Sequence, residues 1–445
     1  MREGGGRWAA INRARRSQKT RPKRSDPQNR NRCHRQMPLT PAADCVYLHW
    51  PTCSAAYSAS PFHEARDCMK ITKIETFKYW IEWCNWLFVK VSTDEGLYGW
   101  GEGSLHGAIE SVETAIHELE PVLIGKDPSG VERHWQAMYH AWRWRGGPTL
   151  FTAMGALDIA LWDLEGKRLG VPVYRLLGGP FRTQLRGYAS HWLAGVDTPE
   201  QAYEGAREAV RRGFTAFKWS PFNVQKLREN EAAAIRHATE LMAAAREGAG
   251  ADVEIFVECG ERLSPRTAVI AAHAFAPYRP GWFEEPIPFE NAKAMASLQR
   301  EMPVPIATGE RLLSRWEFRE LLEEGGCKII QPDLMHAAGI SEVRKIAAMA
   351  DTYYISVAPH NPGGPICMLA AMHLAAAIPN FLILEQMEGE RRLRDALCTQ
   401  PIIYKDGFFE LPTGPGLGSD LHLDVLRDHS FRPQPISGST ESLWK

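Results

Sequence analysis

The sequence predicts an α/β fold, a modified (β/α)8 TIM-type barrel with an α+β capping domain formed from the N-terminal region and the C-terminal segment. Eight short β-rich runs occur between residues 185 and 385, and eight parallel strands close such a barrel. Segments with apolar residues at i, i+3, i+4 and i+7 separate these runs and are typical of helices. A titratable residue ends six successive runs, at intervals of 26, 26, 23, 27 and 25 residues, which indicates a repeated βα unit.

Residues 1–68 form a basic extension that we expect to be disordered. The first 36 residues contain twelve Lys or Arg against two acidic residues and have no apolar period, so they bury too little surface to order themselves. An Arg-rich transit peptide, a nucleic-acid-binding arm and an over-long reading frame are three interpretations. The third is favoured, with the natural start at Met69, because MKITKIE begins a strand-like pattern at once.

The capping domain is predicted over residues 69–182, the barrel over 183–390, and residues 391–445 are expected to return to the capping domain. In the capping domain, NWLFVKVST (85–93) and GLYGWGE (96–102) indicate strands, and helices follow them. Three barrel helices are expected at 291–302, 314–325 and 340–351. The expected barrel strands are LRGYAS (185–190), TAFKWS (215–220), EIFVE (254–258), GWFEE (281–285), PIATGE (305–310), KIIQPD (328–333), YISVAP (354–359) and FLILE (381–385).

The composition limits the possible partners. A chain of 445 residues with 44% hydrophobic content is long enough for a barrel of about 250 residues and a smaller domain. A formal net charge of −1 gives no electrostatic case for a nucleic-acid partner, and no apolar run has the length of a membrane span. The nine cysteines show no C-x-x-C spacing, so we expect a reduced, cytoplasmic chain.

Three carboxylates end consecutive expected strands. Glu258, Glu284 and Glu310 recur every 26 residues, and the C-terminal strand ends of a (β/α)8 barrel converge on one mouth. A single acidic residue at such an end is better explained as the start of a solvated loop. Three glutamates at the ends of consecutive strands, at the same interval, favour a common site. Clustered carboxylates need a counter-charge, and an all-oxygen set favours Mg²⁺, here one ion per subunit.

At this point the chain resembles the enolase superfamily, specifically its mandelate racemase/muconate lactonizing branch and, within it, acid-sugar dehydratases of the galactonate type. The resemblance extends over about residues 69 to 425. Two outer segments contribute to it, GGPTLFTAMGALDIALWDLEGKRLGVPVYRLLGG (146–179) and DGFFELPTGPGLG (406–418). The barrel motifs are FKWSPF, FEEP, ATGERL, QPDLMHAAGISE, APHNPGGP and ILEQ.

The resemblance implies a role for several residues. It makes Glu258, Glu284 and Glu310 the metal ligands and His360 the general base, oriented by Asp333. A carboxylate on the second ring nitrogen fixes the imidazole tautomer and stabilises the imidazolium that forms. Without Asp333, a structural histidine would be the better interpretation of His360.

The resemblance also assigns Lys218 and Glu385 to the substrate carboxylate. Lys218 matches the first lysine of a Lys-x-Lys pair, whose second position is Ser220, and its ammonium would hold that carboxylate. Glu385, if protonated or bridged, would hydrogen-bond the same group. An ordinary exposed lysine and an outward glutamate on a solvated loop are the alternatives. Weaker candidates, for which packing is the alternative, are Tyr79, Trp80, Trp83, Trp86, His106 and His191.

The implied function is a Mg²⁺-dependent dehydratase that converts a sugar acid, an aldonate or aldarate, to a 2-keto-3-deoxy acid. Many relatives read D-x-H where this chain has Glu258-Cys259-Gly260, so the histidine that would protonate the departing hydroxyl is absent. A racemase or epimerase of a 2-hydroxy acid and a metal-binding relative without dehydratase activity are the alternatives. The expected partners are a small-molecule sugar acid and further copies of the chain in a symmetric homo-oligomer.

Overall fold

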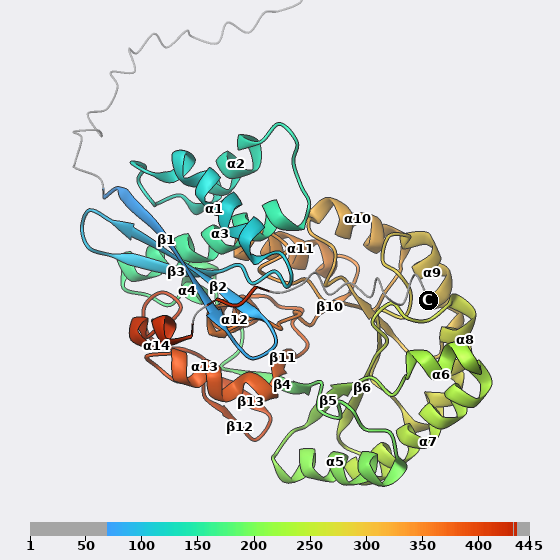
Figure 1. Cartoon of the computed structure of the whole chain (residues 1–445). Helices are drawn as coiled ribbons and strands as arrows, with labels where there is room; N and C mark the ends of the chain where they lie inside the picture. Colours follow the sequence, from blue (N-terminus) through green and yellow to red (C-terminus); the bar gives the residue numbers. More distant parts are fainter. Residues whose placement is uncertain (1–68, 430, 434–445) are drawn as a thin grey trace, which may run out of the picture. The chain divides into compact units, whose positions relative to one another are not determined.

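The structure is a computed structural model that describes residues 69–429 and 431–433. The predicted basic extension, residues 1–68, lies outside the described residues, as do residues 434–445 of the predicted C-terminal segment. Figure 1 shows a small sheet with its helices beside a ring of strands surrounded by helices. The predicted α/β barrel with a capping domain is therefore confirmed.

The capping domain is an antiparallel sheet in the order β1-β2-β3, packed against helices. Strand β2 is buried along almost its whole length, so both faces of the sheet are covered. Gly99 and Gly101 allow α3 to approach β3, because a Cβ at either position would lie about 2 Å from a helix backbone oxygen. The elements are β1 (Ile71–Trp80), β2 (Asn85–Thr93), β3 (Tyr98–Glu102), α1 (Ile109–Leu123), α2 (Val131–Ala141), α3 (Pro148–Leu169) and α4 (Val173–Leu176).

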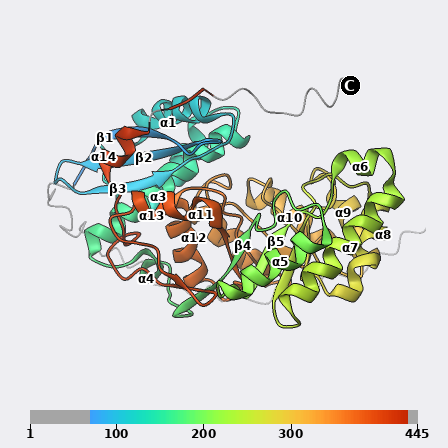
Figure 2. The same cartoon turned by 60° about the horizontal axis from the view of Figure 1, so that its bottom comes forward.

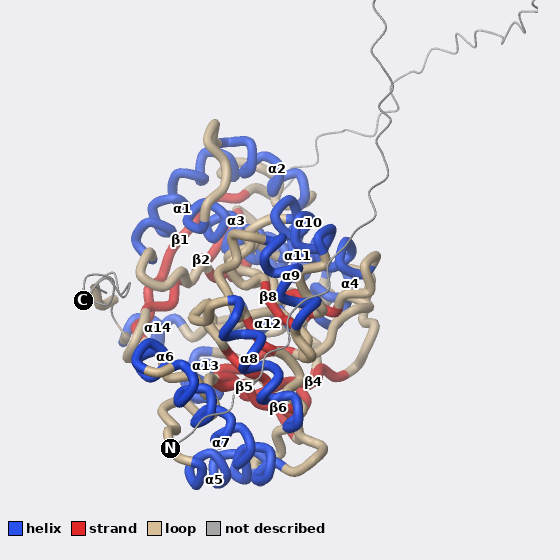
Figure 3. Tube along the Cα trace, turned by 90° about the vertical axis from the view of Figure 1, so that its right-hand side faces the viewer, coloured by secondary structure: helices blue, strands red, loops and turns tan. Residues whose placement is uncertain are grey.

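The barrel strands run parallel in chain order from β4 to β10, and β11 pairs with β4. A single bridge between Val357 and Phe381 joins β10 to the segment that enters β11, so the ring closes. Figure 3 shows the strands inside a layer of helices. The strands are β4 (Gln184–Ser190), β5 (Ala216–Trp219), β6 (Glu254–Glu258), β7 (Phe283–Glu284), β8 (Ile306–Thr308), β9 (Ile329–Ile330), β10 (Ser356–Val357) and β11 (Leu384–Met387).

The outer helices follow the strands as the apolar period predicted. Within the described residues, no helix is both long enough and apolar enough to cross a membrane. The helices are α5 (Pro199–Arg211), α6 (Val224–Glu229), α7 (Glu231–Ala249), α8 (Pro265–Phe275) with η1 (Ala276–Tyr278), α9 (Ala292–Glu301), α10 (Arg315–Glu324), α11 (Ile340–Asp351) and α12 (Pro365–Ala377).

Aromatic side chains fill the barrel beneath the mouth. Phe256 stacks on Trp282 with ring centroids 3.5 Å apart, and both are buried. Phe256 precedes Glu258 by two residues, and Trp282 precedes Glu284 by two. Since side chains alternate along a strand, the aromatic floor and the carboxylates share the inner face.

The C-terminal segment contacts both parts of the fold. Its hairpin, residues 404–410, pairs with the first residues of β4, and its end hydrogen-bonds to the capping sheet through Asn85 and Arg432. Figure 2 shows α14 (Leu423–Asp428) of this segment against the capping sheet. The segment therefore connects the barrel to the capping domain. Its elements are η2 (Glu388–Glu390), α13 (Arg391–Leu397), β12 (Tyr404–Lys405), β13 (Phe408–Glu410) and α14 (Leu423–Asp428).

Candidate active site

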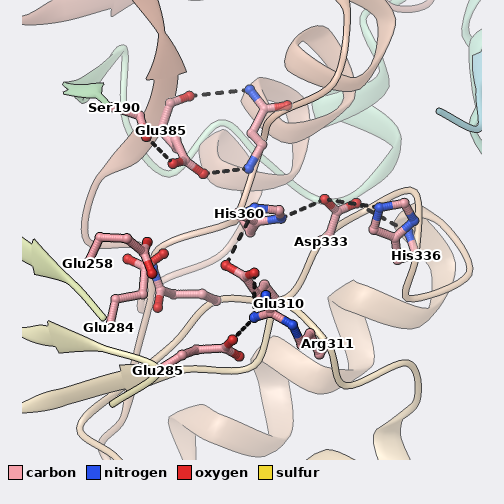
Figure 4. Close-up of polar contacts among 12 residues, drawn as sticks. Ser190, Glu258, Glu284, Glu285, Glu310, Arg311, Asp333, His336, His360 and Glu385 are labelled. Atoms are coloured by element: carbon pink, nitrogen blue, oxygen red, sulfur yellow. Dashed lines mark hydrogen bonds and ion pairs between the residues drawn. The ribbon is translucent and has the colours of Figure 1, made fainter. Parts of the chain in front are cut away.

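Three glutamates meet at the mouth of the barrel (Figure 4). Glu258 ends β6, Glu284 ends β7, and Glu310 lies two residues beyond β8. One carboxylate oxygen of each lies within 4.8 Å of the other two. The structure thus brings the three predicted metal ligands together, and these side chains are only 12%, 0% and 16% exposed.

Lys218 lies among these carboxylates. Its Nζ contacts Glu284 and lies 3.1 Å from Glu258 and 3.0 Å from Glu385. Burial alone would lower the pKa of Lys218, but Glu284 and the other carboxylates outweigh it and raise that pKa well above its usual range. The ammonium therefore serves as a buried counter-charge to the acidic cluster.

The charge balance of the cluster fits a further cation. Burial alone would raise the pKa of Glu258, but Lys218 outweighs it and lowers that pKa, whereas burial raises the pKa of Glu284 well above its usual range. Lys218 alone therefore does not balance the charge of these carboxylates. Three close carboxylate oxygen donors without a sulfur or nitrogen ligand are the set that a hard divalent ion such as Mg²⁺ prefers.

His360 and Asp333 form a hydrogen-bonded pair beside the glutamates. His360 Nδ1 lies 2.8 Å from Asp333 Oδ2, and Asp333 Oδ1 accepts hydrogen bonds from the backbone N–H groups of Met335 and His336. Because the backbone N–H groups favour an ionised Asp333, this carboxylate can only accept a hydrogen bond from His360. The proton between the two side chains therefore lies on Nδ1 of His360. The other nitrogen, Nε2, is left to accept a proton and lies 3.5 Å from Glu310 Oε2.

The charges around His360 govern its basicity. Burial alone would lower the pKa of His360, but Glu310 and Asp333 raise it to about 10. Glu310 raises this pKa because its Oε2 lies 3.5 Å from Nε2 of the imidazole. A cation held by Glu310 would weaken this contribution and lower the pKa of His360 from that value.

Glu385 is enclosed by donors of the chain itself. Its Oε1 accepts from Ser190 Oγ at 2.6 Å, and its Oε2 accepts from the backbone N–H of Asn361 at 2.8 Å. Burial alone would raise the pKa of Glu385, but Lys218 outweighs it and holds that pKa well below the usual range. The protonated form that would donate to a substrate carboxylate is therefore disfavoured.

An arginine that sequence reasoning missed holds the third glutamate. Arg311 Nη1 lies 2.7 Å from Glu310 Oε1 and also contacts Glu285, while its Nε lies 3.4 Å from Glu261 Oε2. One oxygen of Glu310 is thereby fixed, and the other faces His360. The available signal was the motif GER, in which a cation directly follows a predicted ligand.

A second missed carboxylate comes from the capping domain. Glu102 is fully buried at the end of β3 and accepts hydrogen bonds from the backbone N–H groups of Gly364 and Cys367 and from Ser104 Oγ. Gly364 lies four residues after His360. The capping domain thus holds the loop that follows the candidate base.

The weaker candidates take mainly packing positions. Tyr79 and Trp86 are buried in the core, Trp83 Nε1 donates to Glu390 at 3.1 Å, and Trp80 is half-buried.

The two weaker histidine candidates contact side chains of the protein. His106 Nε2 lies 3.5 Å from Cys84 Sγ, and burial with the nearby charges of His336 and His360 lowers the pKa of His106 to about 4. His191 Nδ1 lies 3.0 Å from Ser190 Oγ, and the buried Ser220 Oγ has no hydrogen-bond partner within the part of the chain that the structure describes.

Two protein-family models match the chain. The Enolase C-terminal domain-like family matches residues 201–425, and the mandelate racemase/muconate lactonizing enzyme N-terminal domain matches residues 81–178. The chain belongs to the enolase superfamily. This superfamily member is 39% identical over 368 residues to D-galactonate dehydratase of Pectobacterium atrosepticum, covering 81% of the chain and 94% of that relative.

Solved structures share this enolase-superfamily fold. A proposed dehydratase from Salmonella Typhimurium has 35% sequence identity and a TM-score of 0.78, and the match covers 82% of this chain and 99% of that one. A proposed galactarate dehydratase from Agrobacterium radiobacter, with sodium and L-malate bound, has 31% identity and a TM-score of 0.75 over 83% and 98%. These relatives confirm the predicted resemblance to acid-sugar dehydratases.

Proposed function

We propose that this enolase-superfamily enzyme is a Mg²⁺-dependent dehydratase of a sugar acid, an aldonate or aldarate, and forms a 2-keto-3-deoxy acid. It is a hydro-lyase, the class to which its dehydratase relatives belong. The observation that carries the proposal is the His360–Asp333 pair, whose free nitrogen faces the cluster of Glu258, Glu284 and Glu310.

The proton transfer uses His360. Nε2 accepts the proton from the carbon next to the substrate carboxylate, while Nδ1 remains hydrogen-bonded to Asp333. The Asp333 carboxylate stabilises the imidazolium and keeps the ring in one orientation. When held by the three glutamates, Mg²⁺ supplies positive charge where negative charge develops on the substrate carboxylate.

Departure of the β-hydroxyl completes the reaction. The bond from carbon to the β-hydroxyl breaks, a proton joins the departing oxygen, and water leaves; the resulting enol then tautomerises to the 2-keto-3-deoxy acid. Gly260 offers no acid for this step. We therefore assign the proton to the His360 imidazolium, which returns at Nε2 the proton that it removed.

A screen of aldonic and aldaric acids with Mg²⁺ tests the proposal. We expect at least one acid to give a 2-keto-3-deoxy product with the wild-type enzyme and none with His360→Asn. Removal of Mg²⁺ with a chelator should stop the reaction, and added Mg²⁺ should restore it. Exchange of the α-proton in D₂O with no keto acid formed from any acid would instead indicate a racemase and refute the dehydratase.

A further inference from the structure

A cavity of about 380 Å³ lies between helix α6 and the loop that follows β6. Its lining includes the cations Arg228 and Arg262 and the carboxylates Glu231 and Glu261. Glu261 connects this cavity to the predicted metal site, because its Oε2 lies 3.4 Å from Nε of Arg311, whose Nη1 lies 2.7 Å from Glu310 Oε1. Its charged lining indicates a binding site for a polar group.

The two carboxylates of this lining are bound elsewhere. Glu231 pairs with Arg266, and Glu261 accepts a hydrogen bond from the backbone N–H of Phe289 at 3.1 Å and lies 3.4 Å from Arg311. Within residues 69–429 and 431–433, Arg228 and Arg262 form neither an ion pair nor a side-chain hydrogen bond. By contrast, Lys218 and Arg311 at the mouth are both paired with carboxylates.

The guanidinium of Arg262 lies over Gly260. A Cβ at residue 260 would come within 2.6 Å of Arg262 Nη2 and 2.9 Å of its Nε, so the absence of a side chain makes room for the guanidinium. Residue 260 is two positions after Glu258, a separation of at most about 7 Å along the backbone. A substrate with one end at the glutamates would extend past residue 260 to meet the Arg262 guanidinium.

We propose that Arg262, assisted by Arg228, binds a second anionic group at the end of the substrate remote from the glutamates. This inference rests on the proposed function and restricts its substrate class to dianions, foremost the aldaric acids. A guanidinium binds a carboxylate or a phosphate through two parallel hydrogen bonds, whereas the neutral hydroxymethyl end of an aldonic acid offers no charge to pair with it.

Selectivity among three substrates tests this assignment. The specificity constant kcat/KM is measured for a hexarate, the matching hexonate and the 6-phosphohexonate, with wild type, Arg262→Gln, Arg262→Lys and Arg228→Gln. Arg236→Gln is the matched control, because it removes the same charge from an exposed position on α7 outside the cavity. We expect wild type to prefer the hexarate, and Arg262→Gln to lower the hexarate-to-hexonate ratio by about 10- to 100-fold, as expected for a lost charged hydrogen bond.

Further outcomes separate the possible results. Arg262→Lys should retain part of the preference for the hexarate, and Arg236→Gln should leave the hexarate-to-hexonate ratio of kcat/KM unchanged. A preference for the 6-phosphohexonate would support the anion site with phosphate as its ligand. An equal loss on hexarate and hexonate in Arg262→Gln, or a wild-type preference for the hexonate, would overturn the assignment.

Calorimetric binding of the hexarate to His360→Asn protein, with Mg²⁺ and with or without Arg262→Gln, separates this inference from the proposed function. If no acid is dehydrated but Arg262→Gln still weakens hexarate binding about 10- to 100-fold relative to hexonate binding, the proposed function fails and the anion site stands. If turnover occurs without such a difference in binding or in the kcat/KM ratio, the anion site fails and the dehydratase stands.

Discussion

Replacing Lys218 with methionine should destabilise the protein in the absence of divalent cations. The ammonium is 2% exposed, contacts Glu284, and lies 3.1 Å from Glu258 and 3.0 Å from Glu385. Each charge pair at about 4 Å is worth about 4 kcal/mol at an effective dielectric constant near 20, and burial of the ammonium offsets much of that sum. Removing one member of such a buried set leaves carboxylates uncompensated, so we expect a loss of about 3–5 kcal/mol in the free energy of unfolding.

Urea unfolding in chelator measures this loss. Lys226→Met is the control, because Lys226 forms an exposed pair with Asp197 and should lose less than about 1 kcal/mol. Mg²⁺ at 100 times its dissociation constant adds about 2.7 kcal/mol to the free energy of unfolding of either protein. We expect Lys218→Met to bind Mg²⁺ more tightly, because no ammonium competes for the glutamates. At equal Mg²⁺ concentration, the free energy of unfolding should therefore increase more in Lys218→Met than in wild type. A loss below about 1 kcal/mol in chelator would refute the counter-charge argument.

Four further substitutions probe the site. His360→Asn should abolish turnover and α-proton exchange in D₂O but keep Mg²⁺ binding by calorimetry; exchange at the wild-type rate would place the base elsewhere. Asp333→Asn should lower kcat by about 10⁴, as the equivalent change does in a serine protease, because the amide favours the wrong tautomer; a loss below tenfold would argue against the pair. Arg311→Gln should weaken Mg²⁺ affinity about 10- to 100-fold by freeing Glu310, and unchanged affinity in calorimetry would contradict this. Glu102→Gln should cost about 1–3 kcal/mol in urea unfolding, because its amide nitrogen would face a buried N–H donor; wild-type stability would rule that contact out.

The fold and the positions of the three glutamates were predictable from sequence for one physical reason. In a (β/α)8 barrel the chain returns to the same mouth after every βα unit, so a residue at the end of one strand is close to residues at the ends of its neighbours. Glu258 and Glu284 are indeed register partners on β6 and β7. The roles predicted for these residues remain predictions until the variants are measured.

The partners of the charged side chains were not predictable in the same way. Lys218 was expected to hold a substrate carboxylate, yet its flexible stem reaches back to three carboxylates of the chain. Glu285 turns toward Arg311 from a backbone with φ of 40°, which no strand period indicates. Glu102 reaches the loop after His360 from a separate domain, and such contacts depend on domain packing that local patterns do not encode.

The barrel closes through a shorter pairing at one seam than between the strands that carry the glutamates. Strands β6, β7 and β8, which carry the glutamates, are joined by successive register pairs, whereas β10 meets the segment before β11 through one bridge at Val357 and Phe381. The candidate base at residue 360 lies three residues beyond β10, at this seam. Strand pairing therefore ends before His360, and its hydrogen bond to Asp333 at 2.8 Å is what keeps the imidazole in one orientation beside the metal ligands.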